Sequence, residues 1–383
     1  MKSLQAATSQ ALSIGLRKQS LQFPSLCAIR RPLLQDLNSQ RRFIMSNSAA
    51  WLTAPKARPF EVKSAPAYTP EEHEILVQNR AVAINPVDGS LQAFAWWPME
   101  YPTILGQDVA GEIIAVGSGV TRFKKGDRVV GHALGMATKR VQDNGFQTHT
   151  ILADHMATPL PDTVAYEDAA VIPLGLSTAA CGLFQESPFL QLDLPTHPAQ
   201  KSNGKAILIW GGSSSVGSNA IQLCCAAGYE VITTASAKNF DYVKKLGASK
   251  VLDYNSASIQ EDLTKALHGK DIAGVLDCIG GDALKISVDV LQEVAGKGVI
   301  ATTKGGVDNP PEGISIKRIF GTTLKDNAVG RAIYVDYLPK ALAAGAFIPA
   351  PGPQIVGNGL EHVQQAVDQI MKGVSATKLV VTL

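Results

Sequence analysis

A glycine- and serine-rich run is the part of the chain whose residue types most directly suggest chemistry. It reads Gly211-Gly212-Ser213-Ser214-Ser215-Val216-Gly217, between the apolar run 206–210 and a helical pattern over 218–228. A strand, a glycine-rich turn and a helix in this order are typical of a dinucleotide site, where loop amides and the helix N-terminus receive the pyrophosphate. Ser214 replaces the usual middle glycine, so an ordinary turn between strand and helix is the alternative.

The residues after the next apolar run, 230–234, indicate which dinucleotide would bind. An NAD site usually has an Asp or Glu here for the ribose diol, but this stretch contains Ser236, Lys238 and Asn239 instead. Ser236 and Lys238 suit a 2′-phosphate, and Tyr254 could add a hydroxyl or stack beside the adenosine. We therefore expect NADPH. The alternatives are that Lys238 is a solvated lysine entering a helix and Tyr254 a half-buried strand aromatic.

Two kinds of hydrophobic pattern indicate the elements that position these residues. From 51 to about 172, short apolar runs lie between Gly, Pro and Asp residues, which predicts a β-rich domain; the runs are 75–77, 81–84, 109–116 and 128–130. From 205 to about 300, apolar strands alternate with helix-length segments, as in βαβ units on a buried parallel sheet. The terminal apolar run 378–383 is expected to return to the first domain, and residues 187–204 to form a surface insertion.

Length and composition limit the class of protein. A chain of 383 residues with 45% apolar and 18% charged residues can bury a large core, most simply in two domains. A net charge of +2 does not suggest nucleic acid, and no run approaches the roughly 18 to 20 uninterrupted apolar residues of a membrane helix. The five cysteines form no C-x-x-C pair or close Cys/His cluster. We expect a small-molecule partner, no nucleic acid, no membrane, and a monomer or homodimer.

Residues 1–50 are expected to be a targeting or disordered extension. The first 45 residues carry seven Lys or Arg and one acid, Asp36, which resembles a mitochondrial presequence. Residues 41–46 read Arg-Arg-Phe-Ile-Met-Ser and match the R-x-F-x-x-S pattern of matrix processing proteases, which would leave a mature end near Trp51. This predicts the mitochondrial matrix. The alternative is translation from Met45, which would give a cytoplasmic product.

Five motifs taken together resemble the medium-chain dehydrogenase/reductase superfamily. They are Ile84-Asn85-Pro86-Val87-Asp88, Leu105-Gly106-Gln107-Asp108-Val109-Ala110-Gly111, Lys125-Gly126-Asp127-Arg128-Val129, the loop 211–217, and Lys244-Lys245-Leu246-Gly247-Ala248. The likeness covers residues 51–383 and is greatest to zinc-free fungal enoyl reductases, with quinone oxidoreductases as close relatives.

The resemblance implies an α/β fold in two domains. A GroES-like, β-rich catalytic domain would comprise residues 51–174 and 325–383. A Rossmann NADP-binding domain with a doubly wound parallel sheet, residues 175–324, would be inserted into it, and the active site would lie in the cleft between them.

The resemblance also implies zinc, but the residues at the ligand positions argue against a metal. Asn85 stands where zinc-dependent members have a ligating Cys, Gln107 where they have a His, and Leu174 near the third ligand. None supplies a thiolate or imidazole, and the four-Cys structural lobe is absent from the sequence. We therefore expect no metal, and ordinary structural roles for three β-domain histidines: His132, His149 and His155.

Loss of zinc changes the reaction that the chain would catalyse. Alcohol oxidation in this superfamily relies on zinc, so conjugated acceptors are expected instead. When hydride adds to the β-carbon of an enoyl thioester or enone, charge appears on the carbonyl oxygen and only hydrogen-bond donors and a proton source are needed. The expected activity is NADPH-dependent reduction of such C=C bonds or of quinones. A carbonyl or aldehyde reductase, or a catalytically silent NADPH-binding homologue, is the alternative.

The family's positions imply roles for individual residues. Asn85 and Asp88 are expected beneath the nicotinamide as catalytic residues, with an Asx-stabilised turn as the alternative. The aromatic stretch 95–100 could wall the substrate pocket. Tyr101, which follows it, is a candidate proton donor, with solvent as the alternative.

Further contacts are implied around the cofactor. Thr178 would lie near the nicotinamide carboxamide, unless Ser177 and Thr178 only cap a helix. The remaining expected cofactor contacts, at strand ends and near the C-terminus, are Pro86, Gly280, Thr302, Thr303 and Lys378.

Overall fold

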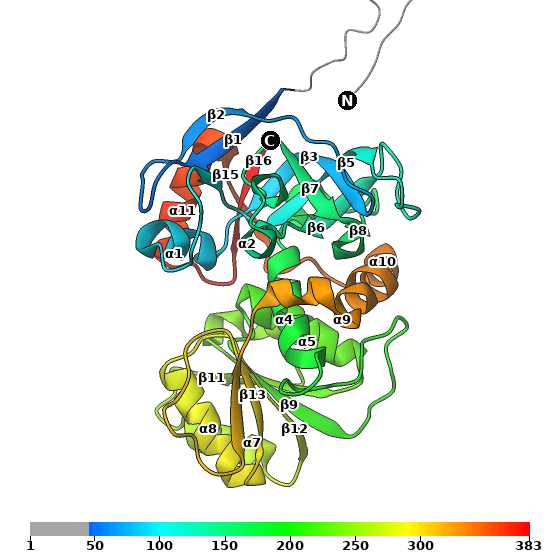
Figure 1. Ribbon diagram of the computed structural model, residues 1–383. Helices are drawn as coiled ribbons and strands as arrows, with labels where there is room; N and C mark the ends of the chain where they lie inside the picture. Colours follow the sequence, from blue (N-terminus) through cyan, green and yellow to red (C-terminus); the bar gives the residue numbers. More distant parts are fainter. Residues whose placement is uncertain (1–45) are drawn as a thin grey trace, which may run out of the picture. The chain divides into compact units, whose positions relative to one another are not determined.

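The computed structural model describes residues 46–383, which form one compact unit. Most strands belong to two sheets, shown in Figure 1. We call the part built on strands β1 to β8, β15 and β16 the mixed-sheet lobe, and the part built on β9 to β14 the parallel-sheet lobe. The predicted targeting segment, its processing motif and the alternative start at Met45 lie outside the described residues.

The first strand begins before residue 51, where the folded part was expected to start. Strand β1 (Asn47–Leu52) pairs with β2 (Glu61–Ala65) and β4 (Thr103–Ile104). The Asn47 side chain is buried; its Nδ2 donates to Gln147 Oε1 at 3.1 Å, and its Oδ1 accepts from the Thr148 hydroxyl at 2.9 Å. Residues 47–50 therefore belong to the fold and not to an extension.

The large sheet of the mixed-sheet lobe contains the C-terminal strand. Its order is β15-β16-β3-β5-β6-β8, with β7 paired to β3. The strands are β3 (Glu74–Ala83), β5 (Asp108–Val116), β6 (Arg128–His132), β7 (His149–Ala153), β8 (Ala157–Pro159), β15 (Pro353–Asn358) and β16 (Lys378–Thr382). Strand β16 pairs with β3, so the expected return of residues 378–383 to the first domain is confirmed.

Strand β3 contains the apolar run 75–77 and all but the last residue of the run 81–84, which the sequence presents as separate. The polar residues between them continue the strand because Asn79 is satisfied inside the fold. Its Nδ2 donates to the Gln147 carbonyl at 2.6 Å and to the Thr150 hydroxyl at 2.8 Å. The polar residues 78–80 therefore form a buried hydrogen-bonding site and a β-bulge within one strand, and not a turn between two strands.

The parallel-sheet lobe has the expected doubly wound sheet. Its order is β11-β10-β9-β12-β13-β14, and every neighbouring pair is parallel. The strands are β9 (Lys205–Trp210), β10 (Glu230–Ala235), β11 (Lys250–Asp253), β12 (Asp271–Asp277), β13 (Gly298–Thr302) and β14 (Ile314–Arg318). The strand order reverses between β9 and β12, and ligands of such sheets bind at the carboxyl ends of strands at this point.

The helices of the two lobes have the following bounds. The mixed-sheet lobe has α1 (Pro86–Phe94), α2 (Gly135–Thr138), α3 (Tyr166–Ala169) and α11 (Val363–Met371). The parallel-sheet lobe has α5 (Ser215–Ala226), α6 (Phe240–Lys245), α7 (Ile259–Leu267) and α8 (Asp282–Ala295). Besides short 3₁₀ helices, the described residues also form α4 (Pro173–Phe184), α9 (Ala328–Arg331), a π-helical segment (Ala332–Tyr337) and α10 (Leu338–Ala343).

Helix α4 is a core helix that follows the mixed-sheet strands. The segment Tyr166–Phe184 is long and apolar enough to cross a membrane, yet 78% of its most apolar window is buried inside the fold. Ala179 and Leu183 are fully buried, as is Cys224 on α5, a helix that packs against α4. Packing inside the protein therefore accounts for this apolar composition.

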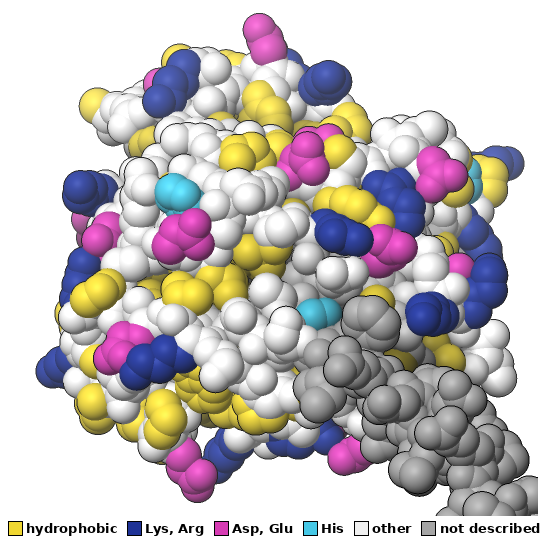
Figure 2. Space-filling model, turned by 90° about the horizontal axis from the view of Figure 1, so that it is seen from above, with side chains coloured by type: hydrophobic (Ala, Val, Ile, Leu, Met, Phe, Trp, Pro, Cys, Tyr) yellow, Lys and Arg dark blue, Asp and Glu magenta, His cyan; other side chains and the backbone are white. Residues whose placement is uncertain are grey.

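The surface shown in Figure 2 carries charges of both signs. Lys and Arg side chains alternate with Asp and Glu, and hydrophobic side chains form small patches separated by other residues. This face presents no broad field of one sign of the kind that attracts a polyanion.

Candidate active site

The loop 211–217 forms a tight connection between β9 and α5. Gly211 has a φ of +86°, and a Cβ on Gly217 would lie 2.3 Å from the Gly211 carbonyl oxygen. Glycine is thus required at both ends of the loop. Ser214, at the position of the usual middle glycine, is the N-cap of α5, and its Oγ accepts a hydrogen bond from Gly217 N at 3.0 Å.

Polar groups without partners lie at the start of α5 and at the end of β13. Ser215 and Val216 open α5, whose first amides have no partner within the helix, and Ser213 lies just before the cap. The hydroxyls of Ser215 and Thr303 are buried without a hydrogen-bond partner among the described residues. Gly212 is tightly packed, because an added Cβ would lie 2.3 Å from the Thr233 hydroxyl. These residues fit the anionic, polar groups of a dinucleotide.

The end of β10 carries the residues expected at the adenosine ribose. Ser236 is half-buried and Lys238 exposed, while the buried Asn239 donates from Nδ2 to the hydroxyls of Ser236 at 3.2 Å and Ser375 at 3.3 Å. Tyr254 lies just after β11 and is 45% exposed, so it is not a half-buried strand residue. The structure brings Ser236 and Asn239 together; the contact with Ser375 was not expected.

Asp277 organises the ends of β12 and β13. Its carboxylate accepts hydrogen bonds from Gly280 N at 3.0 Å and from the Thr302 hydroxyl at 2.7 Å, and its carbonyl accepts from Thr303 N. Thr302 is fully buried, so its hydroxyl holds the loop in place and is not free for a ligand. Gly280 has a φ of +81°, which favours glycine there. Sequence reasoning missed Asp277, which gave no signal beyond its place at a strand end.

A buried polar cluster joins β16 to β5 and to the start of α1. Asn85 Nδ2 donates to Asp108 Oδ2 at 2.8 Å, and Lys378 Nζ donates to Asn85 Oδ1 at 2.5 Å and lies 2.7 Å from Asp108 Oδ2. Leu174 N donates to the other Asp108 oxygen at 2.6 Å. Lys378 was expected at the cofactor, but only 3% of it is exposed and its ammonium is committed to this cluster.

Asp88 and Asn85 also define the first turn of α1. Asn85 is the N-cap, Pro86 is the first helical residue, and Asp88 Oδ2 accepts from Asn85 N at 2.8 Å. The Asp88 side chain stabilises the turn through a side-chain to backbone bond, as the alternative predicted. The Asn85 side chain instead belongs to the buried cluster. Asp88 Oδ1 is buried without a partner among the described residues, and burial raises the pKa of Asp88 to about 7.

The residues at the implied zinc-ligand positions are a poor chemical match for zinc. Within residues 46–383, no group of three or more His, Cys, Asp or Glu is placed to hold a metal ion. The positions implied as ligands carry two amides and one apolar side chain, Asn85, Gln107 and Leu174. The nearby carboxylate, Asp108, is already paired with the Lys378 ammonium. This donor set does not suit zinc.

His132 belongs to a buried hydrogen-bond chain. Its Nδ1 lies 2.9 Å from Ser177 Oγ, which lies 2.7 Å from the Tyr334 hydroxyl, and its Nε2 lies 3.4 Å from Gln107 Oε1. Burial lowers the pKa of His132 to about 4, so the ring is neutral at neutral pH. This histidine was expected to be an ordinary β-domain residue, and its link to Gln107 was not foreseen.

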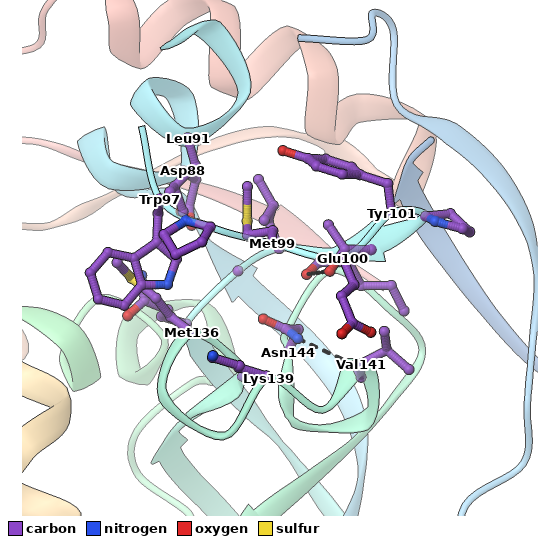
Figure 3. A pocket seen from close by; sticks show the side chains of 18 residues that line it. Asp88, Leu91, Trp97, Met99, Glu100, Tyr101, Met136, Lys139, Val141 and Asn144 are labelled. Atoms are coloured by element: carbon purple, nitrogen blue, oxygen red, sulfur yellow. Dashed lines mark hydrogen bonds between the residues drawn. The ribbon is translucent and has the colours of Figure 1, made fainter. Parts of the chain in front are cut away.

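A cavity of about 370 Å³ lies beside the cluster in the mixed-sheet lobe. Figure 3 shows side chains from α1, the 97–105 segment and α2 converging on it. Its lining includes Asp88, Leu91, Trp97, Met99, Glu100, Tyr101, Gln107, Met136, Lys139, Val141 and Asn144. Apolar and aromatic side chains with a few polar groups are typical of a small-molecule pocket.

The aromatic stretch 95–100 forms part of this wall. Trp97 and Tyr101 line the cavity, and the Trp97 ring centroid lies 6.4 Å from that of Phe320, which follows β14. Trp96 does not line the cavity and donates to Ser90 Oγ at 3.0 Å.

Thr178 does not cap a helix. Both Ser177 and Thr178 lie inside α4, and the Thr178 hydroxyl donates to the Leu174 carbonyl at 2.7 Å. The capping alternative is therefore wrong.

Three further residues of the cavity wall were not predicted: Met136, Lys139 and Asn144. The sequence contained no recognised motif for them.

A GroES-like sheet, an inserted doubly wound sheet with a glycine-rich nucleotide loop, and a small-molecule pocket in the mixed-sheet lobe define a dehydrogenase or reductase class. The chain matches the alcohol dehydrogenase GroES-like domain over residues 71–173 and the zinc-binding dehydrogenase domain over residues 215–335. It therefore belongs to the medium-chain dehydrogenase/reductase family and is an oxidoreductase.

Curated fungal relatives extend this likeness to most of the chain. The zinc-binding alcohol dehydrogenase domain-containing protein cipB of Emericella nidulans is 60% identical, covering 88% of this chain and 99% of the relative. The trans-enoyl reductase himH of Aspergillus japonicus is 40% identical, covering 88% and 97%.

Solved structures share the fold. An alcohol dehydrogenase superfamily protein from Novosphingobium aromaticivorans has a TM-score of 0.70 and 25% identity, covering 88% of this chain and 99% of that chain. The Escherichia coli quinone oxidoreductase complexed with NADPH has a TM-score of 0.66 and 21% identity, covering 88% and 100%.

Proposed function

We propose that this chain is a zinc-independent, NADPH-dependent reductase that delivers hydride to an activated C=C bond of an enoyl or enone compound, or to a quinone. The observation that carries the proposal is the buried cluster beside the cavity. There the Lys378 ammonium and the Asn85 amide surround Asp108 where a zinc-dependent relative would need thiolate and imidazole ligands. A small-molecule acceptor fits the cavity, whose wall combines aromatic and aliphatic side chains with polar ones.

The chain's own groups support binding of a phosphorylated dinucleotide. Bound NADPH supplies the hydride. The loop 211–217 and the start of α5 would hold its pyrophosphate, and Ser236, Lys238 and Asn239 would face the 2′-phosphate. No carboxylate competes for the ribose at the end of β10.

We assign acceptor binding and protonation to residues that line the cavity. Trp97 and Met99 would hold a conjugated acceptor and keep water from it. When hydride forms the new C–H bond at the β-carbon, the electron pair of the C=C bond moves toward the carbonyl oxygen. A proton then adds to the α-carbon. Its donor is Tyr101, which lines the cavity, or solvent.

The proposal is tested with the purified chain, NADPH or NADH, and three acceptors: 4-phenyl-3-buten-2-one, 1,4-benzoquinone and benzaldehyde. We expect reduction of the enone or the quinone with NADPH, unchanged by a zinc chelator. Reduction of benzaldehyde alone would indicate a carbonyl reductase, tight NADPH binding without any turnover would indicate a silent homologue, and stoichiometric zinc in the active protein would reject the metal-free site.

The preference for NADPH over NADH is tested separately with a variant of Lys238. Replacing Lys238 by Ala should weaken NADPH binding by about 10- to 100-fold, because a charge-assisted hydrogen bond contributes about 1.5 to 3 kcal/mol, and should leave NADH binding unchanged. Lys244→Ala, which removes an exposed lysine from nearby α6, is the matched control. Calorimetric titration measures both, and an equal loss for the two cofactors would reject the assignment of Lys238.

A further inference from the structure

We propose that Asn144 and Lys139 form a hydroxyl-binding subsite in the wall of the cavity, which selects acceptors that carry an alcohol group as well as the conjugated C=C bond or quinone ring. This inference rests on the proposed function and narrows its substrate class. Both residues line the cavity, and both lie in the segment that begins with α2.

The orientation of the Asn144 amide is fixed by the backbone around it. Its Nδ2 donates to the Arg140 carbonyl at 3.0 Å and lies 3.5 Å from the Val141 carbonyl. The reverse orientation would place the amide oxygen against two carbonyl oxygens, none of which can donate. The nitrogen therefore faces the backbone of residues 140 and 141, and the oxygen faces away from it.

The oxygen of this amide is available to a ligand. Asn144 is only 6% exposed, and within residues 46–383 no N–H or O–H group donates to its Oδ1. The atom is not one of the fully enclosed side-chain atoms without a partner, so it reaches the cavity surface. In Figure 3 it lies on the side of the amide opposite the dashed hydrogen bond. A nearly buried carbonyl oxygen is unfavourable unless a donor binds it.

The Asn144 side chain is held rigidly in this position. A Cβ on Gly135 would lie 2.0 Å from Asn144 Nδ2 and 2.2 Å from Oδ1, so the absence of a side chain at Gly135 makes room for the amide. The Asn144 backbone carbonyl accepts from Gln147 Nε2 at 2.7 Å and from the Thr150 hydroxyl at 2.9 Å. The acceptor is thus pre-organised, as a specificity site requires.

Lys139 supplies a cation to the same cavity. It is the C-cap of α2 and has a φ of +61°, a left-handed conformation in which glycine is the usual residue. The next residue, Arg140, is paired with three carboxylates, whereas the Lys139 ammonium has no ion-pair partner among the described residues. A lysine kept in a conformation that favours glycine indicates that its side chain is used.

The two groups together define the chemistry of the ligand. The Asn144 oxygen can only accept a hydrogen bond, and the Lys139 ammonium can only donate one. A hydroxyl group does both, whereas a carboxylate or an ether has no proton for Asn144 and an ammonium group cannot accept from Lys139. Trp97 and Met99 in the same wall suit the carbon frame of the acceptor. A site that hydrogen-bonds a substrate hydroxyl discriminates against analogues that lack it.

Paired acceptors test the subsite. They are the 2-, 3- and 4-hydroxymethyl ring derivatives of 4-phenyl-3-buten-2-one, their methyl ethers and the parent enone. Calorimetric titration into the wild type saturated with NADP⁺, which carries no hydride, gives the Kd of each. We expect at least one alcohol to bind about tenfold more tightly than its methyl ether and the parent. With NADPH, the kcat/KM of that alcohol should exceed that of its ether by a similar factor.

Variants of both residues assign the preference. Asn144→Leu should abolish the advantage of the alcohol and leave the affinity for the parent enone unchanged. Lys139→Met should reduce the advantage about threefold, because an exposed ammonium contributes less than a buried one. Lys56→Met is the matched control, since Lys56 is also an exposed lysine in the left-handed region, with a φ of +62°, but lies outside the cavity wall. NADP⁺ affinity should be the same in all these proteins.

Two results would overturn the inference alone: no alcohol that binds the wild type more tightly than its ether, or an advantage that persists in Asn144→Leu. If Asn144→Leu fails to bind NADP⁺ because it does not fold, the wild-type comparison and Lys139→Met decide, and an advantage unchanged by Lys139→Met overturns the inference. A wild type that reduces neither the enones nor 1,4-benzoquinone would reject the proposed function, and the titrations keep the two failures apart because they need no turnover.

Discussion

At the scale of single residues, the main departure from expectation is Lys378. The sequence placed it among cofactor contacts, but its aliphatic neighbours on β16 draw it into the sheet, where its charge is matched by Asp108. A buried ion pair is strongly destabilised when one partner is removed, because the other charge is left without compensation.

Replacing Lys378 by Met should therefore lower the free energy of unfolding by about 3 to 5 kcal/mol. Adding Asp108→Asn to Lys378→Met should recover part of this loss, because the uncompensated carboxylate is then gone. Denaturant titration measures both, with Lys372→Met, on an exposed lysine, as the control. A change below about 1 kcal/mol for Lys378→Met would show that the pair is not buried as described.

Asp88 makes stability depend on pH in a defined direction. Burial raises its folded-state pKa to about 7 from the ordinary 3.8 of an aspartate, so between about pH 4 and 7 the folded state holds a proton that the unfolded state has lost. The Asp88 contribution to stability therefore falls as pH rises through this window and levels off above it.

The isosteric variant Asp88→Asn cannot ionise and lacks this pH dependence. Its free energy of unfolding relative to the wild type should rise by about 1 to 3 kcal/mol between pH 5 and pH 8. Urea titrations at the two pH values give the difference. A constant gap between the two proteins would mean that Asp88 ionises normally in the folded state.

The sequence indicated Asn85, Asp88, Tyr101 and the glycine loop because these residues occur in short local motifs. It did not indicate the roles of His132, Gln107 and Asp277, because their partners are distant in the chain. His132 contacts Ser177, 45 residues away, and the Lys378 ammonium reaches Asn85, 293 residues away. Tertiary hydrogen bonds of this kind leave no periodicity or spacing in a single sequence.

At the scale of elements, the parallel sheet was the most predictable part. Its strands are continuous apolar runs buried on both faces, and the intervening segments have helix length. The mixed sheet was harder to predict, because β3 passes through polar residues that become satisfied only when the 145–150 segment packs beside them. Strand β1 was missed for a similar reason, since its buried Asn47 is polar.

The tight packing at the junction of β9 and α5 makes this site sensitive to a single added methyl group. In Gly217→Ala, the new Cβ would lie 2.3 Å from the Gly211 carbonyl oxygen and 2.7 Å from Gly212 Cα, and these backbone atoms cannot move without opening the loop. NADPH binding should weaken at least tenfold, and the free energy of unfolding should fall by about 1 to 3 kcal/mol. Gly352→Ala, where an added Cβ meets nothing within 4 Å, is the control. Calorimetry and denaturant titration would contradict the prediction if both variants behaved alike.

At the scale of the whole molecule, β1 sets where the folded chain must begin. Ala49 and Ala50 are fully buried, and Ala50 N donates to the Phe146 carbonyl at 2.9 Å. A chain that starts at Ser46 keeps these contacts, whereas one that starts at Trp51 loses them together with Asn47. We expect the first to match the Tm of the full chain and the second to melt several degrees lower. Equal melting temperatures in a thermal scan would show that β1 is dispensable.

The position of β16 in the sheet affects the order in which the two lobes can fold during synthesis. The parallel-sheet lobe ends its strands at Arg318, so it can collapse while the last sixty or so residues are still being made. The mixed sheet cannot close until its final strand slots between β3 and β15. Because that strand also carries the Lys378 ammonium that pairs with Asp108, a polypeptide that stops before it would expose an open sheet edge and leave the Asp108 carboxylate without its cation.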